Sequence, residues 1–445
     1  MQNAFSKVQK LLNTKSLAAA IITNPANIFY LTGFRGISPQ EREAILVVTL
    51  KTATLITARL YQAEARKLAS PSLKIKIAEH RNEINEFIKD AISIVGLPTE
   101  TKVLVGFEEH DLKFSEFKEF KKILNETGQY SSSRRQEVSL KTDSRHPRPS
   151  VIPAKAGIGI NSSEDQILNQ VFDRESQTES VQDDSGKFSP PSGGSNNSRP
   201  IRHKLIPIKH LVEDLRIIKS ADEIKNIERA QLISQKAFEQ IIKTIKIGQT
   251  EAEIAEKLAQ IIKSLGAPSL AFDSIVASGP NSAKPHHVTS NRRLAINDTL
   301  LLDFGAKYKD YCADLSRTIF IGKATDQYRN IYIHVEKAQK LAIAKIKANA
   351  KASTTFKAAH DYFKNHKLDS YFLHSLGHGI GLEVHERPSV SKKSKDTLAE
   401  GMVFSVEPGL YFPAWGGVRI EDLVVIKNSK ANILGKSSQF VEIKI

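Results

Sequence analysis

The sequence contains very little cysteine and no long apolar run. Cys312 is the one cysteine among 445 residues, which excludes a framework of disulfides within the chain and fits a reducing compartment. The apolar run at residues 17–22 is short, and Asn24 and Pro25 follow it without a small-residue cleavage site. We therefore expect neither a signal peptide nor a membrane span, and a cytoplasmic location.

Aromatic residues are scarce beside the many basic ones. The formal net charge is +15, and lysines such as Lys337, Lys340 and Lys345 fall on predicted helix surfaces. No nucleic-acid-binding motif accompanies them. We interpret the charge as a lysine-rich solvated surface, and we expect no nucleic-acid partner and no membrane partner.

The first part of the chain, residues 1–128, alternates short aliphatic runs with helical patterns. Such alternation predicts an open α/β domain. The predicted strands are residues 17–23, 44–50, 73–78 and 102–107, and the predicted helices are residues 60–68, 84–94 and 114–124. The whole chain is 40% hydrophobic and 25% charged, so it is long and apolar enough for two or three domains.

Residues 129–203 differ in composition from the rest of the chain. They are rich in Ser, Pro, Gly, Asn and Gln, with the runs SSSRRQ and SPPSGGSNNS and no sustained periodicity. This composition cannot bury enough apolar surface to offset the entropy of ordering, so it predicts a disordered insert. A spacer is the main interpretation and a partner-binding segment the alternative. Residues 204–215 are then expected to form a last strand and linker.

The last part of the chain, residues 216–445, opens with two helix-start signals. Ser220 and Glu223 form one predicted capping box, and Thr250 and Glu253 form a second. Apolar residues at helical spacing follow each box, and further helices are expected at residues 326–350 and 355–365. Helices that cover a strongly twisted antiparallel sheet would account for this part, which we classify as α+β.

The stretch from Thr299 to Phe320 carries two aspartates in apolar surroundings. We expect Asp303 on a first strand and Asp314 on a second, with the polar run Lys307–Asp310 between them as the reversal. A buried carboxylate is costly unless a cation compensates its charge. The hairpin therefore predicts a metal between the two acids.

Three more candidate ligands lie further along in apolar segments. His378 is in HSLGHGIGLEVHE, Glu407 in MVFSVEPG and Glu421 in GGVRIEDLVVI. Four carboxylates and one imidazole match the charge of two divalent cations, and an oxygen-rich set suits manganese, cobalt or zinc. Arg419 alternates with Val418 and Ile420, so we expect it to share one face of a strand with Glu421.

The ligand order resembles that of the pita-bread metallopeptidases, which include methionine aminopeptidase, aminopeptidase P and prolidase. Asp314 lies eleven positions after Asp303, Pro and Gly follow Glu407, and the resemblance extends from about Leu215 onwards. The stretch NIFYLTGF at residues 27–34 is similar to the N-terminal domain of aminopeptidase P, prolidase and creatinase, which methionine aminopeptidase lacks. The resemblance implies a creatinase-like α/β domain followed by a pita-bread catalytic domain.

The resemblance also implies roles for the ligands. Asp314 and Glu421 would bridge two metals, Asp303 would bind one ion, and His378 and Glu407 would bind the other. A hydroxide between the metals would attack the substrate, and Glu407 would move the proton to the leaving nitrogen.

Four further side chains receive roles from the same resemblance. Arg419 would orient a ligand carboxylate. His286 lies seventeen positions before Asp303, where the family has its catalytic histidine, and would donate to the tetrahedral intermediate. His374 and His385 would line the substrate pocket and stabilise the transition state. The neighbouring His287 is expected to face solvent or to make a secondary contact.

The expected function is removal of the N-terminal residue from peptides with proline in the second position, by a homodimer with two divalent ions, most simply Mn²⁺. A prolidase restricted to dipeptides is the first alternative, and it would need a group such as Arg387 or Arg35 to hold the free carboxylate. Methionine aminopeptidase, a metal-free creatinase-like hydrolase and a noncatalytic peptide-binding relative are the others.

Overall fold

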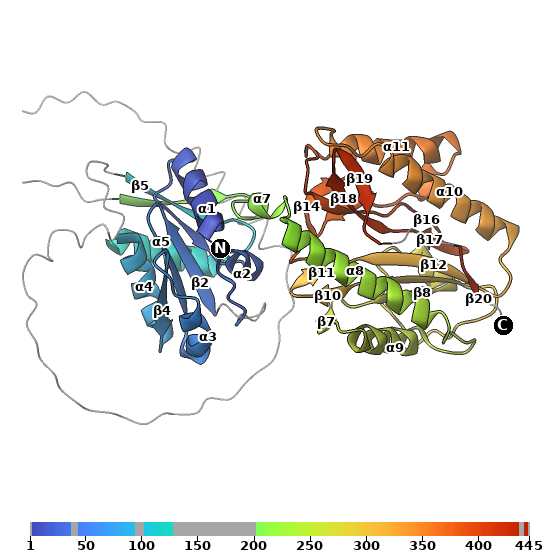
Figure 1. Cartoon of the computed structure of the whole chain (residues 1–445), viewed down its shortest axis with the longest axis horizontal. Helices are drawn as coiled ribbons and strands as arrows, with labels where there is room; N and C mark the ends of the chain where they lie inside the picture. Colours follow the sequence, from blue (N-terminus) through green and yellow to red (C-terminus); the bar gives the residue numbers. More distant parts are fainter. Residues whose placement is uncertain (1, 37–42, 94–101, 128–201, 436–439, 444–445) are drawn as a thin grey trace, which may run out of the picture. The chain divides into compact units, whose positions relative to one another are not determined.

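The computed structural model describes residues 2–36, 43–93, 102–127, 202–435 and 440–443. The chain divides into two compact units, Met1–Leu211 and Val212–Ile445, which we call the N-terminal unit and the catalytic unit (Figure 1). The predicted insert at residues 129–203 lies almost entirely outside the described residues. No helix in the described part of the chain is both long and apolar enough to cross a membrane.

The N-terminal unit is built on a mixed sheet with the strand order β4-β3-β2-β1-β5-β6. Its strands are β1 Ala19–Ile22, β2 Ala44–Thr49, β3 Ala53–Ala58, β4 Leu73–Ala78, β5 Lys102–Glu108 and β6 Arg202–Ile208. Its helices are α1 Gln2–Thr14, α2 Pro25–Thr32, α3 Gln62–Lys67, α4 Arg81–Ser93 and α5 Phe114–Thr127, with a 3-10 turn η1 at Arg59–Tyr61. The predicted α/β class is confirmed, whereas β3, α1 and α2 were not expected.

The segment NIFYLTGF forms most of α2, a short helix held by a buried acid. Asn24 caps the helix by accepting from the Asn27 backbone at 3.0 Å, and Gly33 ends it in the left-handed conformation. Glu108 at the end of β5 accepts from the Thr23 and Asn24 backbones at 2.6 and 2.7 Å. These bonds fix the start of α2 against the sheet.

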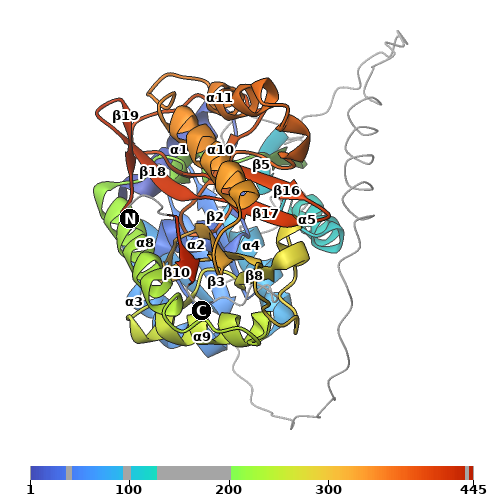
Figure 2. The same cartoon turned by 90° about the vertical axis from the view of Figure 1, so that its right-hand side faces the viewer.

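Helices cover both faces of the strands in the catalytic unit. They are α7 Glu213–Arg216, α8 Ala221–Ile241, α9 Glu251–Ser264, α10 Asp326–Ile343 and α11 Ala352–Asn365, with 3-10 turns η3 at Gly279–Ala283 and η4 at Asp369–Tyr371. Both predicted capping boxes are present, at Ser220 and at Thr250. Figures 1 and 2 show α8 and α9 on one side of the strands and α10 and α11 on the other.

The strands of the catalytic unit fall into four small sheets. One has the order β20-β12-β9-β8, a second β14-β13-β15-β18-β19, and two smaller ones are β11-β10-β7 and β16-β17. Their bounds are β7 Ser269–Leu270, β8 Ile275–Ser278, β9 Thr299–Phe304, β10 Ala306–Tyr308, β11 Tyr311–Cys312, β12 Leu315–Ile321, β13 Gly377–Gly379, β14 Glu386–Val390, β15 Val403–Val406, β16 Gly409–Phe412, β17 Gly416–Arg419, β18 Asp422–Lys427, β19 Lys430–Ile433 and β20 Glu442–Ile443. One apolar core joins α8 and α9 to β8, β9 and β12, and another joins α10 and α11 to β14–β18.

The two aspartates are not placed on a simple hairpin. Asp303 lies on β9 and is opposite Ser316 of β12, while Asp314 lies in the gap between β11 and β12. The chain between them forms its own small hairpin, β10–β11. Gly305 permits this crossing, because a Cβ at that position would lie 1.8 Å from the Ala313 carbonyl oxygen.

Arg419 and Glu421 also differ from the prediction, because they do not lie on one strand. Arg419 is the last residue of β17, which pairs with β16, whereas Glu421 lies in the connection to β18, which pairs with β15. Within this connection the Glu421 backbone donates to the Ser316 carbonyl at 3.1 Å. The chain changes sheets between the two residues, and alternation along the sequence cannot indicate this.

Candidate metal centre and active site

Three of the five predicted ligands form a compact cluster in the catalytic unit. Asp314, His378 and Glu421 each offer one ligand atom, and these atoms all lie within 4.8 Å of one another. The Nε2 atom of His378 is 3.3 Å from Glu407 Oε1 and 3.6 Å from Asp314 Oδ2. The ligands are thus drawn from the β11–β12 gap, β13, the end of β15 and the β17–β18 connection.

Several carboxylate oxygens of the five predicted ligands are buried without a hydrogen-bond partner among the described residues. They are Oδ1 of Asp303, Oδ1 of Asp314 and Oε1 of Glu421. Leaving a charged oxygen buried and unpaired is costly, unless a cation takes the place of the missing donors. Oxygen atoms with one imidazole nitrogen are a donor set for divalent cations such as Mn²⁺. The residues present therefore fit the metals that their chemistry implies.

The tautomer of His378 supports the same conclusion. Its Nδ1 lies 3.0 Å from the Gly379 carbonyl oxygen, which can only accept, so the proton is on Nδ1. The Nε2 atom then faces the carboxylates of Asp314 and Glu407. A backbone carbonyl that fixes the other nitrogen is common at metal-binding histidines, so this orientation suits a metal ligand.

The acids of the cluster have strongly perturbed pKa values. Burial and the neighbouring Glu421 carboxylate raise the pKa of Asp314 well above its usual range. Burial raises the pKa of Glu407 to about 7, and burial with the nearby Glu407 and Asp303 carboxylates raises that of Glu421 to about 8. Desolvation and repulsion between like charges oppose ionisation here, and divalent cations would reverse both effects.

Arg419 is 3% exposed and connects the acids to the rest of the site. Its guanidinium donates to Asp303 Oδ2 at 2.6 Å, Ser316 Oγ at 2.8 Å, the Tyr411 hydroxyl at 3.0 Å and the Pro285 carbonyl at 3.2 Å. The contact with Asp303 is the kind of contact expected of an arginine that orients a ligand carboxylate.

Two hydroxyl groups that sequence reasoning missed hold the other acids. Ser316 on β12 donates to Glu421 Oε2 at 2.9 Å, and Ser405 on β15 donates to Glu407 Oε1 at 3.0 Å. The Ser405 hydroxyl also accepts from the His378 backbone at 3.0 Å. Both serines lie on buried strands, and only Ser405, which apolar residues flank, carried a local signal in the sequence.

His374 is fixed at both ring nitrogens. Its Nδ1 donates to the Ser375 carbonyl at 2.7 Å, so its Nε2 accepts from the Tyr411 hydroxyl at 2.8 Å. Burial and the positive charge of Arg419 lower the pKa of His374 to about 3. The imidazole is therefore neutral at physiological pH. Tyr411 links it to Arg419, a connection that the sequence did not indicate.

The remaining predicted histidines lie at the exposed edge of the same site. The ring centroid of His385 is 4.4 Å from that of His378, and burial together with the charge of His378 lowers the pKa of His385. His286 is exposed, and it is close enough to contribute to the lowered pKa values of His374 and His385. His287 does not face solvent, because its Nε2 lies 2.9 Å from the buried Glu251.

Of the two arginines proposed to hold a dipeptide carboxylate, Arg387 is already engaged by other side chains in the structure. Arg387 forms ion pairs with Asp214 and Asp396, which occupy both of its terminal nitrogens. Arg35 belongs to the N-terminal unit, where its guanidinium lies 5.4 Å from the ring centroid of Phe29.

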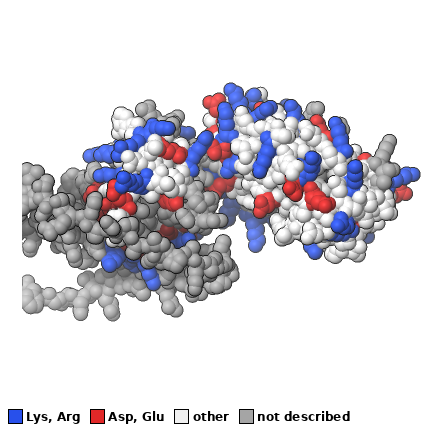
Figure 3. All heavy atoms as spheres, turned by 90° about the horizontal axis from the view of Figure 1, so that it is seen from below, with Lys and Arg blue, Asp and Glu red and all other residues white. Residues whose placement is uncertain are grey.

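One face of the catalytic unit shows how its charged residues are distributed. On the face drawn in Figure 3, lysines and arginines of the catalytic unit are interspersed with acidic and uncharged residues. This distribution is the one expected of an ordinary solvated surface.

Comparisons with known proteins agree with this geometry. The profile of metallopeptidase family M24 matches residues 225–428, and that of the creatinase/prolidase N-terminal domain matches residues 5–134. The chain is 43% identical to an Xaa-Pro dipeptidase of Pyrococcus furiosus over 52% of this chain and 67% of that protein. It is 44% identical to an uncharacterized peptidase of Bacillus subtilis over 50% of this chain and 63% of that protein. The match thus spans about two thirds of the length of these curated relatives.

Solved structures resemble the chain over nearly its full length. An Xaa-Pro dipeptidase from Bacillus anthracis has a TM-score of 0.76 at 27% identity, covering 99% of both chains. An X-Pro aminopeptidase from Thermotoga maritima has a TM-score of 0.72 at 26% identity, covering 98% of this chain and 99% of that one. The predicted combination of an α/β domain with a pita-bread catalytic domain is thereby confirmed.

Proposed function

Since the chain belongs to metallopeptidase family M24, we propose that it removes the N-terminal residue of peptides whose second residue is proline. The observation that supports this reaction most directly is the group of buried, unpaired carboxylate oxygens on Asp303, Asp314 and Glu421 beside His378 Nε2. Such a group of side chains can hold two divalent cations. The substrate of the protein would then be a peptide.

Manganese is the proposed metal, because the donors are carboxylate oxygens with one imidazole nitrogen and no thiolate. Asp303, Asp314, His378, Glu407 and Glu421 would be the side chains that hold the two ions. When bound, the cations would lower the pKa of an attacking water and polarise the scissile carbonyl.

Glu407 is the acid to which we assign proton transfer. Ser405 donates to its Oε1 atom, which fixes the carboxylate beside His378. From this position Glu407 would take a proton from the attacking water and give it to the leaving nitrogen.

His286 would donate a hydrogen bond to the developing oxyanion, because its exposed imidazole has no competing partner among the described residues. His374 and His385 would line the substrate pocket beside His378. Arg419 would keep Asp303 oriented toward the cations.

Preference for proline rests on the relatives, whose names describe Xaa-Pro dipeptidases and an X-Pro aminopeptidase. Proline lacks a backbone N–H and has a fixed φ, so general peptidases cleave the bond before it poorly. An enzyme that cleaves this bond needs a pocket suited to proline. Restriction to dipeptides is the second candidate, since the relative that is 43% identical is named a dipeptidase. Arg387 is already paired with Asp214 and Asp396, so it does not support a restriction to dipeptides.

A peptide panel tests the proposal. We expect the protein reconstituted with Mn²⁺ to cleave Ala-Pro-Ala and Ala-Pro but not Ala-Ala-Ala, with Co²⁺ and Zn²⁺ compared in parallel. Cleavage of Ala-Pro alone would establish the dipeptidase, and faster cleavage of Met-Ala-Ser would contradict the preference for proline.

Matched carboxylate variants complete this test. Asp314→Asn should abolish turnover and lower the bound metal, because it removes a shared ligand. Asp222→Asn is the control, since that side chain is 91% exposed on the first turn of α8 and contributes little.

A further inference from the structure

The position of His286 is set by its neighbours in the chain. The side chain is exposed and makes no hydrogen bond to another described residue. The residues on either side of it are fixed, however. The Pro285 carbonyl accepts from Arg419 Nη1 at 3.2 Å, and His287 Nε2 donates to Glu251 Oε2 at 2.9 Å.

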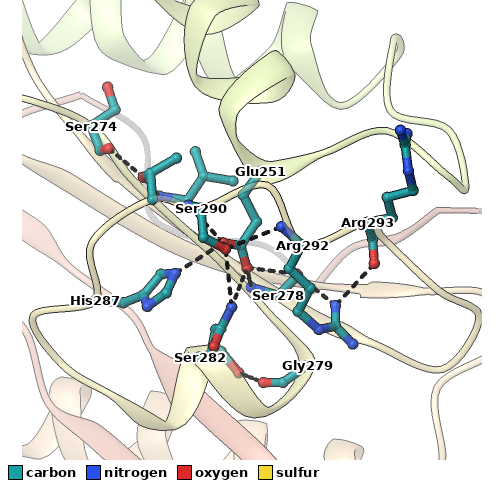
Figure 4. A network of polar contacts seen from close by, with 12 residues as sticks. Glu251, Ser274, Ser278, Gly279, Ser282, His287, Ser290, Arg292 and Arg293 are labelled. Carbon is teal, nitrogen blue, oxygen red and sulfur yellow. Dashed lines mark hydrogen bonds and ion pairs between the residues drawn. The ribbon is translucent and has the colours of Figure 1, made fainter.

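Glu251 is fully buried and accepts six hydrogen bonds from one segment, residues 278–290, which we call the histidine segment (Figure 4). Its Oε1 atom accepts from the Ser278 backbone and hydroxyl, both at 2.7 Å, and from Asn281 Nδ2 at 3.0 Å. Its Oε2 atom accepts from His287 Nε2 at 2.9 Å and from the Ser290 backbone and hydroxyl at 3.0 and 2.6 Å. One carboxylate thus binds both ends and the middle of the segment.

The carboxylate is held in its ionised form. Burial by itself would raise the pKa of Glu251, but the hydrogen bonds from Ser290, Asn281, Ser278 and His287 lower it to about 2. An ionised carboxylate only accepts, which suits an environment of donors. An amide of the same size would instead direct an N–H group at the N–H group of Ser278 or Ser290.

The side chain of Glu251 does not serve the helix that carries it. The start of α9 is already capped, because Thr250 Oγ1 accepts from the Glu253 backbone and Glu253 Oε2 accepts from the Thr250 backbone. All six donors to the Glu251 carboxylate come instead from the histidine segment. A role limited to helix stability does not explain this arrangement.

The other side of the histidine segment is fixed to β17 and β9. Ser282 Oγ accepts from the Gly417 backbone at 2.9 Å and lies 2.7 Å from Thr299 Oγ1. Together with the bond from Arg419 to Pro285, these contacts hold the backbone around His286 on the side opposite to Glu251.

We propose that Glu251 is a positioning residue for His286, acting through Ser278, His287 and Ser290 to hold the histidine segment at the edge of the metal cluster. The proposal rests on the proposed function, in which His286 stabilises the oxyanion. Glu251 itself touches neither substrate nor metal. Its removal should therefore affect the reaction through His286 and leave the metal ligands in place.

A double-mutant cycle tests this coupling in the Mn²⁺-loaded full-length protein. Glu251→Gln should lower kcat for Ala-Pro-Ala by about 10–100-fold, because small displacements of a reacting group are that costly. In the His286→Ala background the same substitution should lower kcat by less than about twofold, since no imidazole remains to be positioned. Equal losses in both backgrounds would overturn the proposal, and bound metal should be unchanged in every variant.

A control variant in a different part of the core separates a general loss of stability from a specific loss of kcat. Tyr328→Phe removes a buried hydroxyl that donates to the Thr318 carbonyl at 3.1 Å, away from the histidine segment. It should lower Tm, with the same kcat in Mn²⁺-loaded folded protein. If Glu251→Gln fails to fold, Ser290→Ala takes its place in the cycle, because it removes the hydrogen bond from the Ser290 hydroxyl to Glu251 Oε2.

Hydrogen exchange provides a readout that does not depend on turnover. Glu251→Gln should speed amide exchange at residues 278–290 relative to residues 251–264, and unchanged exchange there would overturn the proposal. If the wild-type protein cleaves no Xaa-Pro peptide, the proposed function is wrong. The exchange result then still decides whether Glu251 holds the segment.

Discussion

At the scale of single residues, Arg419 connects most of the features of the candidate site. One guanidinium contacts a ligand carboxylate, a serine that holds a second ligand, the tyrosine that fixes His374, and the carbonyl that precedes His286. A planar group with several donors in a fixed geometry can do this, whereas a lysine ammonium cannot.

Arg419→Lys should therefore weaken both metal binding and turnover. We expect a loss of about 10–100-fold in kcat/KM and a comparable loss in Mn²⁺ affinity, the usual effect of removing a group that orients a ligand. Metal titration and steady-state kinetics measure the two effects. Arg293→Lys is the matched control, because in the described part of the chain that arginine side chain donates to the Gly248 carbonyl alone.

A variant that kept full metal affinity while losing turnover would show that Arg419 acts on the substrate and not on Asp303.

The sequence indicated five candidate ligands, three of which the structure brings into one cluster, but not the groups that hold them. Asp303, Asp314, His378, Glu407 and Glu421 are charged or titratable residues within apolar segments, which is a strong local signal. Ser316, Ser405 and Tyr411 are ordinary residues of strands, and their roles depend on which strands become neighbours. The expectation that Arg419 and Glu421 share one face of a single strand was wrong for the same reason, since the chain changes sheets at Ile420.

At the scale of elements, the path of the chain between β9 and β12 requires a close approach of two backbone segments, at Gly305 and Ala313. Gly305 lies where a Cβ would be 1.8 Å from the Ala313 carbonyl oxygen, and neither backbone can move without displacing Asp303 or Asp314.

Gly305→Ala should lower the free energy of unfolding by about 1–3 kcal/mol, the range for overpacking, and reduce metal binding. Chemical denaturation and metal titration test this. Gly248→Ala is the control: its φ is +85°, with open space around the position. It should cost about 1–3 kcal/mol through backbone strain and leave metal binding unchanged. Full metal affinity in Gly305→Ala would contradict the assigned role of the crossing.

Elements with strong local signals were predictable, and those defined by tertiary pairing were not. The capping boxes at Ser220 and Thr250 mark α8 and α9 directly. By contrast, β3 follows β2 after a three-residue turn, and the sequence showed no clear break between them. The predicted helix at 326–350 ends at Ile343, where the Lys345 and Ile346 backbones donate to carbonyls three residues back in turns, and the periodicity of the sequence does not reveal this change.

At the scale of the whole molecule, the buried acids make the stability of the protein dependent on pH and metal. In the metal-free protein Glu407 and Glu421 have pKa values of about 7 and about 8, against an ordinary value of 4.5. The folded state then keeps protons that the unfolded state has already lost. The free energy of unfolding therefore decreases as pH rises from about 4.5 to about 8.

We expect the chelator-treated protein to have a higher Tm at pH 6 than at pH 8.5. Saturating Mn²⁺ should raise Tm more at pH 8.5, where the ligands are already deprotonated. Thermal unfolding with and without metal at the two pH values measures this. Glu421→Gln removes one titrating group, so it should reduce the pH dependence of the metal-free protein. A pH dependence of opposite sign would show that the acids are not the dominant titrating groups.

The sheet order has a consequence for how the protein assembles. Asp303 and Glu421 are remote in the sequence, and they approach only because β12 lies beside both β9 and the β17–β18 connection. Contacts between distant segments form late and slowly during folding. We therefore expect the ligands to come together only after the sheets have formed, so that a cation would enter a folded protein. On this view the metal-free protein should fold first and accept different divalent ions afterwards.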